Sequence, residues 1–302
     1  MPQKTESAEE KKFSPPLTLC KKWLRDWHVA NLERVRDCRF PPPKAPDKLT
    51  LILYSFLDDE RLFDHHEFGI LQTWRTIGKY PLVIVTDRKT ARLDSFARQH
   101  QDACSIVISD SLKSGSIDSM NYDCIVNLHK YFSTPSCLIV QDDGFPIRGG
   151  IEDFLGKWDY AGAPLVRDLP WQNLADWMLI NIENGGFCLR SRRCCEATAN
   201  LYLQKKDSFT QEQIKLEDWF YCCYARKNIW HRLKYSFAPA SKAREFSFID
   251  IEGLIDIRTL KKTPLGIHGP TTIWQFRNYL AREFGYVDVP VPHEATRPLA
   301  SP

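Results

Sequence analysis

Two pairs of adjacent carboxylates are the side chains of this sequence best suited to chemistry. Asp142 and Asp143 follow the apolar run 137–140 after a single residue, Gln141, where a buried strand is expected to end in a turn. Hard oxygen ligands at such a turn can hold a divalent cation, which can bridge a diphosphate and neutralise its charge as it leaves. Taken alone, the motif is better explained as two aspartates that cap a turn.

The second pair, Glu217 and Asp218, precedes the aromatic run 219–221. A carboxylate beside buried material can act as a general base on a hydroxyl, because burial and the neighbouring acid adjust its pKa. When this pair stands alone, negative charge at a helix N-terminus is the better explanation.

A glycine pair could bring backbone close to a ligand. Asn184, Gly185 and Gly186 follow an apolar stretch, and glycine leaves room where a Cβ would stand in the way. Alone, the tripeptide is simply a good turn. Of the arginines that follow, which could face phosphates, Arg192 and Arg193 are better explained by a solvated helix start.

A histidine from elsewhere in the chain could complete a metal site. His268 lies in the segment PLGIHGP, whose glycines and prolines predict an irregular loop. A lone histidine is usually a surface or satisfied core residue. A site based on aspartates, however, often needs a further nitrogen or oxygen ligand from a distant segment. Only the fold can bring His268 to Asp143.

Alternating strands and helices must position these residues. Apolar runs at 49–57, 81–87, 104–110 and 137–144 alternate with amphipathic stretches at 60–78, 91–100 and 117–132. This pattern predicts an α/β fold, a three-layer α/β/α sandwich with a mostly parallel central sheet. Ligands of such sheets collect outside the carboxyl ends of the strands, where Asp142 and Asp143 are expected.

The sequence predicts one main domain with short extensions. Residues 1–47 are expected to form a disordered tail, a helix with Trp23 and Trp27 that packs on the domain, and a Pro-rich linker. The main domain is expected over 48–285, ending in an amphipathic helix. Residues 286–302 are expected to form an irregular tail.

Composition excludes several classes of protein. With 302 residues, 43% of them hydrophobic and 26% charged, the chain is expected to fold as a globular protein. Its net charge of +3 is far from that of a dedicated DNA binder, so nucleic acid is not expected as a partner. No apolar run approaches the roughly 20 residues of a membrane span.

The cysteines and the N-terminus indicate a compartment. The ten cysteines include no CxxC pair, so buried free thiols are expected instead of disulfides or a zinc site. The first residues do not have the apolar core of a secretory signal. A reducing, cytoplasmic location is therefore expected.

Taken in order, the motifs resemble those of a little-characterised bacterial family of GT-A-type glycosyltransferase-like proteins. Members of that family carry strings such as QWDGF, YDYIGAPW, NGGFSLRS, an ED pair and FGFHG. This chain reads QDDGF, WDYAGAP, NGGFCLRS, LEDWF and LGIHG in the same order. The similarity covers residues 48–268, and five ordered motifs are much more specific than any one of them.

The resemblance implies a GT-A-like fold and a hexosyltransferase-like enzyme (EC 2.4). It would move a sugar from a nucleotide-sugar donor, with UDP favoured, to the hydroxyl of a glycan or other acceptor, with inversion. Asp143 would hold Mn²⁺ or Mg²⁺, with His268 as second ligand. Asp218 would be the catalytic base, with Glu217 as its neighbour.

The resemblance also implies a set of donor-binding residues. Gln141 stands where the wider group has its first aspartate, and Asp142 occupies the variable middle position. The residues that the resemblance implies to contact the donor are Tyr54, Ser55, Asp87, Gln141, Asp142, Asn184, Gly185 and Gly186.

Two other functions remain open from the sequence. The substituted Gln141–Asp142 pair is compatible with a non-catalytic protein that binds a carbohydrate or a nucleotide-sugar on the same scaffold. Metal-bound aspartates at a strand end also serve nucleotidyl transfer, which would release pyrophosphate instead of a nucleoside diphosphate.

Overall fold

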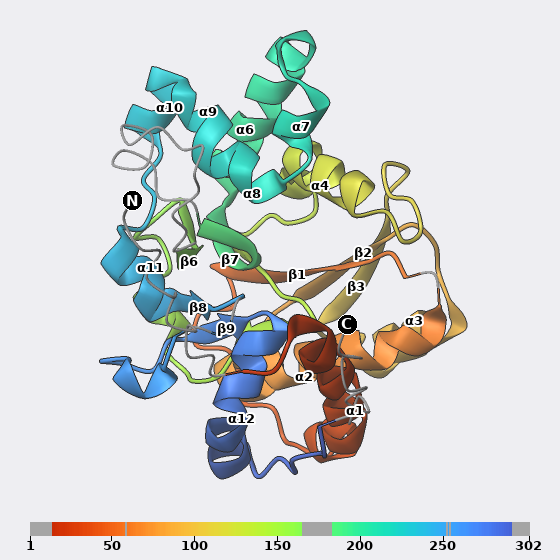
Figure 1. Cartoon of the computed structure of the whole chain (residues 1–302). Coiled ribbons are helices and arrows are strands. Elements are labelled where there is room, and N and C mark those ends of the chain that lie inside the picture. The colour runs from red at the N-terminus through yellow and green to blue at the C-terminus, as the bar shows by residue number, and fades with distance from the viewer. Residues whose placement is uncertain (1–13, 58, 165–182, 252, 254, 292–302) are drawn as a thin grey trace, which may run out of the picture.

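A computed structural model describes residues 14–57, 59–164, 183–251, 253 and 255–291. At its centre lies a six-stranded sheet with the order β3-β2-β1-β4-β7-β6 (Figure 1). Its strands are β1 (Leu49–Ser55), β2 (Leu82–Thr86), β3 (Cys104–Ile108), β4 (Ser136–Ile139), β6 (Tyr160–Pro164) and β7 (Glu183–Ser191). The first four pair in parallel, whereas β7 runs antiparallel to both β4 and β6.

Helices cover both faces of this sheet, which gives three layers (Figure 1). On one face lie α1 (Leu17–Arg36), α2 (Phe63–Ile77), α3 (Ala91–Gln99) and α12 (Pro270–Phe284). On the other lie α4 (Ile117–Val126), α6 (Arg192–Lys205), α7 (Gln211–Ile214), α8 (Glu217–Trp219), α9 (Ala225–Lys227) and α10 (Ile229–Lys234). The predicted fold class, α/β with a mostly parallel sheet between two helical layers, is confirmed.

Alternation along the strands divides the buried side chains between the two layers. Leu51 and Leu53 of β1 pack with α1 and α2, whereas Ile52 and Tyr54 pack with α4 on the opposite face. Successive strand residues point to opposite faces, so each strand contributes to both cores. No helix in the described part of the chain is long and apolar enough to cross a membrane.

A second, three-stranded sheet has the order β5-β9-β8 and joins distant parts of the chain. It consists of β5 (Gly144–Pro146), β8 (Ser247–Ile249) and β9 (Gly266–His268), and α11 (Ala240–Phe246) leads into β8. Antiparallel pairing of β5 with β9 sets Gly144 opposite His268. This pairing places the late histidine segment beside the turn that follows β4.

Short helical turns connect the larger elements. The 3₁₀ turns are η1 (Glu60–Leu62), η2 (Leu128–Lys130), η3 (Ile151–Asp153), η4 (Lys206–Ser208) and η6 (Ile257–Thr259), and η5 (Phe220–Tyr224) is a π-helical turn. The π-turn continues directly from α8, so the Glu217–Asp218 pair sits at the start of an irregular helical segment. Such π-turns inside helices occur frequently at functional sites.

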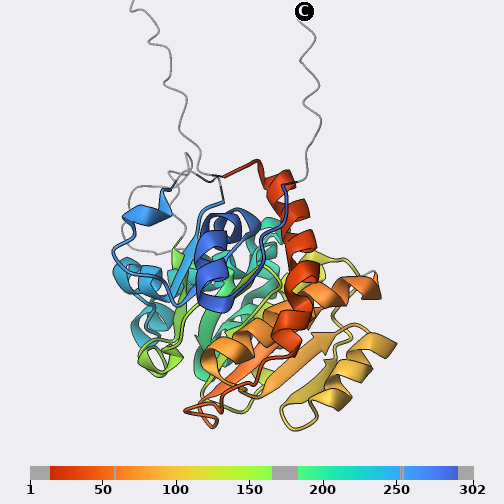
Figure 2. The same cartoon turned by 90° about the horizontal axis from the view of Figure 1, so that it is seen from below.

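The N-terminal helix α1 packs along α2 and α12, as the sequence predicted (Figure 2). Trp23 and Trp27 are buried. The ring of Trp23 meets Trp274 of α12 edge-on with centroids 4.9 Å apart, and Trp27 meets Phe68 of α2 at 5.1 Å. Helix α1 is therefore part of the main hydrophobic core.

Asn31 of α1 fixes the segment that follows α12. Its buried amide nitrogen donates to the carbonyl of Val287 at 2.9 Å, and its oxygen accepts from the amide of the same residue at 2.8 Å. Because Asn31→Ala leaves buried backbone groups without partners, we expect it to lower the free energy of unfolding by about 1–3 kcal/mol. Urea denaturation measures this, with the exposed Arg34→Ala as control within about 0.5 kcal/mol of wild type. Equal stability of the two variants would contradict the prediction.

All ten cysteines lie in described parts of the chain and are free thiols. Seven of them are buried, and these include Cys124, Cys137, Cys188 and Cys195 in the core next to α4 and α6. The expectation of buried free thiols is confirmed for those seven.

Candidate active site

The turn after β4 presents the first carboxylate pair. Gln141 and Gly144 close this turn through two backbone hydrogen bonds of 2.9 and 3.2 Å, so Asp142 and Asp143 occupy its centre. Helix α2 packs directly against it, since a Cβ on Gly69 would lie 2.5 Å from the carbonyl oxygen of Gln141. The aspartates thus lie beyond the carboxyl end of a parallel strand, as predicted.

His268 meets this turn through the β5–β9 pairing. The amide of Gly269 donates to the carbonyl of Asp143 at 2.7 Å. The Nε2 atom of His268 lies 3.2 Å from Oε1 of Gln141 and 3.4 Å from Oδ1 of Asp143. The side chains of Asp143 and His268 are 26% and 13% exposed, so a small ligand can reach both.

Glycines make the space that this imidazole occupies. A Cβ on Gly186 would lie 2.1 Å from Nε2 of His268, and a Cβ on Gly144 would lie 2.9 Å from its Cδ2. Both distances are below any real contact of a Cβ atom, so larger residues would displace the ring. The need for glycine at 186 therefore follows from the position of the histidine.

Burial and the charges of their neighbours shift the pKa values of Asp142, Asp143 and His268. Burial raises the pKa of Asp142 to about 6, and the neighbouring Asp143 adds to the effect. Burial also acts to raise the pKa of Asp143, but His268 outweighs it and the pKa is lowered. Conversely, burial acts to lower the pKa of His268, and Asp143 outweighs this so that the pKa is raised. Asp143 is therefore an ionised acceptor at neutral pH.

The glycine pair also contacts the second carboxylate pair. A Cβ on Gly185 would lie 1.8 Å from Oε1 of Glu217, and the Gly185 amide donates to Oδ2 of Asp218 at 3.3 Å. The negative charge of Asp218 also acts to raise the pKa of His268. Gly185 and Gly186 thus lie between the two acidic groups, at the point where β7 passes below α8 (Figure 1).

The two carboxylates of the second pair have different surroundings. Glu217 forms an ion pair with Arg190, which is fully buried, and the guanidinium of Arg190 lies over the rings of both Tyr160 and Tyr221. Burial raises the pKa of Glu217 to about 7 against the opposing effect of Arg190. Asp218 is half-buried and accepts from the amide of Trp219 at 2.8 Å. Burial raises its pKa as well, so Asp218 is the more accessible carboxylate and holds a proton more strongly than usual.

The arginines after the glycine pair do not converge on one point, so they do not form a phosphate-binding group. Arg190 points into the core, Arg193 pairs with the buried Asp159 at 2.6 Å, and Nε of Arg192 donates to the carbonyl of Phe132 at 3.1 Å. The expected solvated helix start is confirmed for Arg192 and Arg193, which are exposed and open α6. The burial of Arg190 could not be predicted, because the sequence does not show that β7 is a central strand buried on both faces.

Two of the expected nucleotide contacts share one cavity. Ser55 and Asp87 line a narrow cavity where β1 and β2 end, together with Thr86 and Arg88. Asp87 accepts from the hydroxyl of Ser114 at 2.6 Å. Tyr54 lies on the opposite face of β1, buried against α4, as strand alternation requires.

Three histidines near the aspartate turn escaped the sequence analysis. His65 and His66 lie in the first turns of α2, and His28 faces His65 from α1 with ring centroids 5.5 Å apart. Burial lowers the pKa of His28 and of His66, and the charge of Asp143 acts in the opposite direction on both. The sequence does contain a feature that could have predicted them, the adjacent pair His65–His66 in the helix after the first strand. That helix begins at the ligand-binding edge of the sheet.

The donor atoms at the turn fit a divalent cation. Two ligands at right angles, each about 2.1 Å from a cation, lie about 3 Å apart, close to the 3.2 and 3.4 Å between Nε2 of His268 and its two oxygen neighbours. Within the described residues, no group of three or more His, Cys, Asp or Glu side chains is arranged to hold a metal. Magnesium-type sites commonly use one or two protein carboxylates and complete their shell with water and substrate phosphates.

Comparisons with known proteins give a family of unknown function and several solved structures. The model of a family described as "Protein of unknown function (DUF5672)" matches residues 119–268. No curated protein matches the sequence.

Among solved structures, the mannosyltransferase PcManGT from Pyrobaculum calidifontis, in complex with GDP-Man and Mn²⁺, is 12% identical with a TM-score of 0.39, covering 73% of this chain and 65% of that one. The glycosyltransferase GlyE from Streptococcus pneumoniae is 12% identical with a TM-score of 0.42, covering 73% and 54%. TarS 1-349 from S. aureus, in complex with UDP, is 13% identical with a TM-score of 0.34, covering 58% and 54%. The chain thus spans less than two thirds of each of these structures.

Proposed function

We propose that this protein is a metal-dependent glycosyltransferase that moves a sugar from a nucleotide-sugar, with a UDP-sugar favoured, to an acceptor hydroxyl with inversion. The observation that carries the proposal is the position of Gly185 and Gly186, which lie between the Asp143–His268 pair and the Glu217–Asp218 pair. The two glycines thus separate a cation-binding pair on one side from a carboxylate base on the other. Because glycine has no side chain, a ligand can lie close to the backbone between them.

Asp143 and His268, with Gln141 beside them, would hold Mn²⁺ or Mg²⁺. When bound, the cation would neutralise the negative charge that develops on the departing diphosphate. Ser55 and Asp87 would contact the nucleoside at the ends of β1 and β2. Asn184, Gly185 and Gly186 would border the donor sugar.

Asp218 would accept the proton of the acceptor hydroxyl. As that oxygen forms its bond to the anomeric carbon, the bond from this carbon to the diphosphate oxygen breaks, and its electron pair leaves with the nucleoside diphosphate. The raised pKa of Asp218 favours its role as the proton acceptor. Glu217, held by Arg190, would position the segment that carries Asp218.

A donor panel tests the proposal. Nucleotide release is measured with Mn²⁺ and UDP-, GDP-, dTDP- and CMP-sugars, for wild type, Asp143→Ala and the control Asp207→Ala, which changes an exposed carboxylate. We expect one class of donor to give a signal that Asp143→Ala loses and Asp207→Ala keeps. Release of pyrophosphate would instead indicate nucleotidyl transfer, and metal-dependent binding without turnover would indicate a non-catalytic binding protein. The proposal would also be refuted if no donor gave nucleotide release and calorimetry detected no metal-dependent nucleotide binding.

The glycine at 186 provides a separate test of the metal site. Because a Cβ there overlaps Nε2 of His268, we expect Gly186→Ala to weaken Mn²⁺ binding by about 10- to 100-fold, as changes to groups that orient a ligand commonly do. Gly149→Ala is the matched control, since its Cβ would come no closer than 3.7 Å to a neighbouring atom. Titration of each variant with Mn²⁺ by calorimetry measures the difference. Equal affinity of Gly186→Ala and wild type would place the metal elsewhere.

A further inference from the structure

Helix α10 presents three large apolar side chains to solvent at the outer edge of its helical layer (Figure 1). Trp230 and Leu233 are 76% and 72% exposed, and Ile229 is 46% exposed. At 3.6 residues per turn, these positions lie on one side of the helix. On the other side His231 is 6% exposed, and its Nε2 lies 3.1 Å from Oγ1 of Thr198 in α6. Helix α10 is therefore anchored by one face and exposes an apolar face.

Cations surround this apolar face. Residues 219–244 contain six Lys and Arg residues and no Asp or Glu, whereas the whole chain has a net charge of only +3. Lys227 and Lys234 are exposed, and Arg232 is partly exposed. Lys234 follows Trp230 by one helical turn, and Lys227 lies just before the helix. Among the residues that the structure describes, no carboxylate forms an ion pair with any of these three cations.

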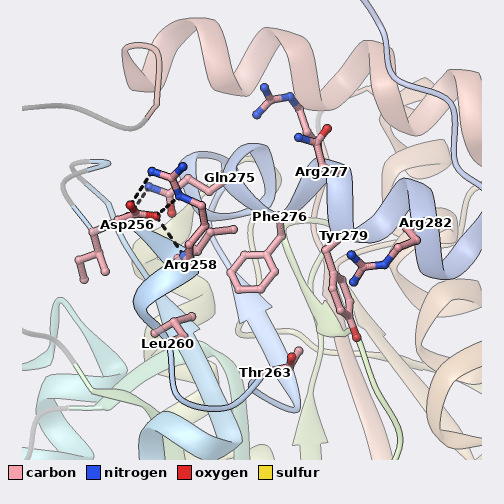
Figure 3. Close-up of a pocket in the computed structure, with 12 residues that line it drawn as sticks. Asp256, Arg258, Leu260, Thr263, Gln275, Phe276, Arg277, Tyr279 and Arg282 are labelled. Carbon is pink, nitrogen blue, oxygen red and sulfur yellow. Dashed lines mark hydrogen bonds and ion pairs between the residues drawn. The ribbon is translucent and has the colours of Figure 1, made fainter.

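The arginines beside the cavity of about 490 Å³ between η6 and α12 differ from these cations (Figure 3). Arg258 pairs with Asp256 at 2.6 Å, as Figure 3 shows, and Arg282 pairs with Glu283 at 2.9 Å. Phe276, in the same lining, is only 4% exposed. The charges of these two arginines are thus neutralised locally, whereas α10 combines cations outside ion pairs with exposed apolar side chains.

This combination fits an anionic lipid surface better than another macromolecule. The headgroups of anionic lipids attract Lys and Arg, and Trp and Leu enter the boundary between headgroups and acyl chains. A nucleic acid would use the cations but would leave the three apolar side chains in water. A stable protein interface commonly buries about 1,200–2,000 Å², which is large for the outer face of one six-residue helix. A bilayer is fluid, so a small projecting patch can enter it without a matching shape.

We propose that the outer face of α10 binds the surface of a bilayer that contains anionic phospholipids. This α10 surface is formed by Lys227, Ile229, Trp230, Leu233 and Lys234. Its apolar side chains enter the headgroup boundary, and its two lysines contact the anionic headgroups. The binding is peripheral and reversible, because one short helix buries far less apolar surface than a membrane span. It requires neither donor nor metal, so it does not rest on the proposed function.

Co-sedimentation of the full chain with sucrose-loaded vesicles tests this surface. One set of vesicles consists of phosphatidylcholine alone, and the other of phosphatidylcholine and phosphatidylserine in equal parts. The variant Trp230→Ala/Leu233→Ala removes most of the apolar face, and Lys227→Glu/Lys234→Glu reverses the charge around it. All four positions are exposed, so both variants are expected to fold, which circular dichroism checks.

Matched controls make the same changes elsewhere on the surface. Val29→Ala/Ile117→Ala removes two apolar side chains that are each 61% exposed but lie on different helices, α1 and α4. Lys21→Glu/Lys22→Glu changes the net charge by the same amount at two exposed positions of α1.

We expect the wild type to bind the phosphatidylserine vesicles at least about tenfold more tightly than phosphatidylcholine alone. Each α10 variant should lose at least about tenfold of this affinity, and both controls should stay close to wild type. Raising the ionic strength from about 0.1 to about 1 M should release the wild type, because the Debye length falls to about 3 Å.

The proposal is wrong if the wild type binds neither kind of vesicle, if it binds both equally, or if either α10 variant binds as the wild type does. A chain that ignores vesicles but dimerises in sedimentation equilibrium, with the dimer lost in Trp230→Ala/Leu233→Ala, would also overturn it. The α10 surface would then bind a second copy of the chain.

Discussion

Replacing Asp218 with asparagine is expected to lower turnover of the nucleotide-sugar by about 10²- to 10⁴-fold, the range that a positioned general base contributes. The amide cannot accept the proton of the acceptor hydroxyl. The side chain is otherwise nearly the same size, and its remaining oxygen can still accept from the amide of Trp219. The loss should therefore appear in kcat, with little change in the binding of donor or metal.

The control for this variant is Asp118→Asn, which makes the same change at an exposed position in the first turn of α4. Nucleotide release, Mn²⁺ binding by calorimetry and urea unfolding are measured on both variants. Asp218→Asn turnover within a few-fold of wild type would remove Asp218 from the mechanism. A parallel loss of Mn²⁺ binding would show instead that Asp218 belongs to the metal site.

Asp218 and Glu217 are adjacent, yet their expected roles differ for a structural reason. Glu217 points to the buried Arg190, whereas Asp218 is half-buried and is held by backbone amides from α8 and from Gly185. The Glu217 carboxylate is 9% exposed and faces Arg190, so an acceptor hydroxyl reaches Asp218 more easily. The resemblance placed both residues in the catalytic group, with Asp218 as the base and Glu217 as its neighbour, but the surroundings that separate them become visible only when the helix that carries them is placed.

The first half of the chain was the part most readily predicted from sequence. Its strands are short apolar runs separated by amphipathic helices, so local patterns determine both the elements and their parallel pairing. Thr90 and Ser116, whose side chains cap α3 and α4, reinforce the helix starts locally. The predicted helix over 117–132 is nevertheless too long, since α4 ends at Val126 and a separate turn follows.

The candidate site depends on contacts that no local pattern encodes. His268 reaches Asp143 through the pairing of the three-residue strands β5 and β9, which are too short to have a period of their own. His65 and His66 approach the same turn because α2 packs against it, and His28 does so because α1 packs along α2. Ordered motifs could predict that these segments belong together, but the partners within each segment come from the fold.

Breaking the buried ion pair is the second large effect that the structure predicts. We expect Glu217→Leu to lower the free energy of unfolding by about 3–5 kcal/mol, because it leaves the charge of Arg190 in the core without its partner. Arg190→Met should cost less, because Glu217, whose pKa is raised to about 7 even beside Arg190, takes up a proton when the arginine is absent. The side chains of Arg190 and Glu217 are 0% and 9% exposed, so water cannot replace the missing charge. The thiols of Cys124 and Cys188 also receive hydrogen bonds from Arg190, but they are weak acceptors and carry no compensating charge while protonated.

The double variant Arg190→Met/Glu217→Leu is expected to recover most of this loss, because it removes both desolvated charges together and leaves apolar groups beside the rings of Tyr160 and Tyr221. Urea unfolding of the four proteins gives the coupling energy. The exposed pair Lys242–Glu245, 2.9 Å apart, is the matched control, and its coupling should stay below about 1 kcal/mol. A coupling of similar size in both pairs would mean that water reaches Arg190. Because Glu217 precedes Asp218 directly, a stable double variant that has lost turnover would show that the ion pair serves to position the base.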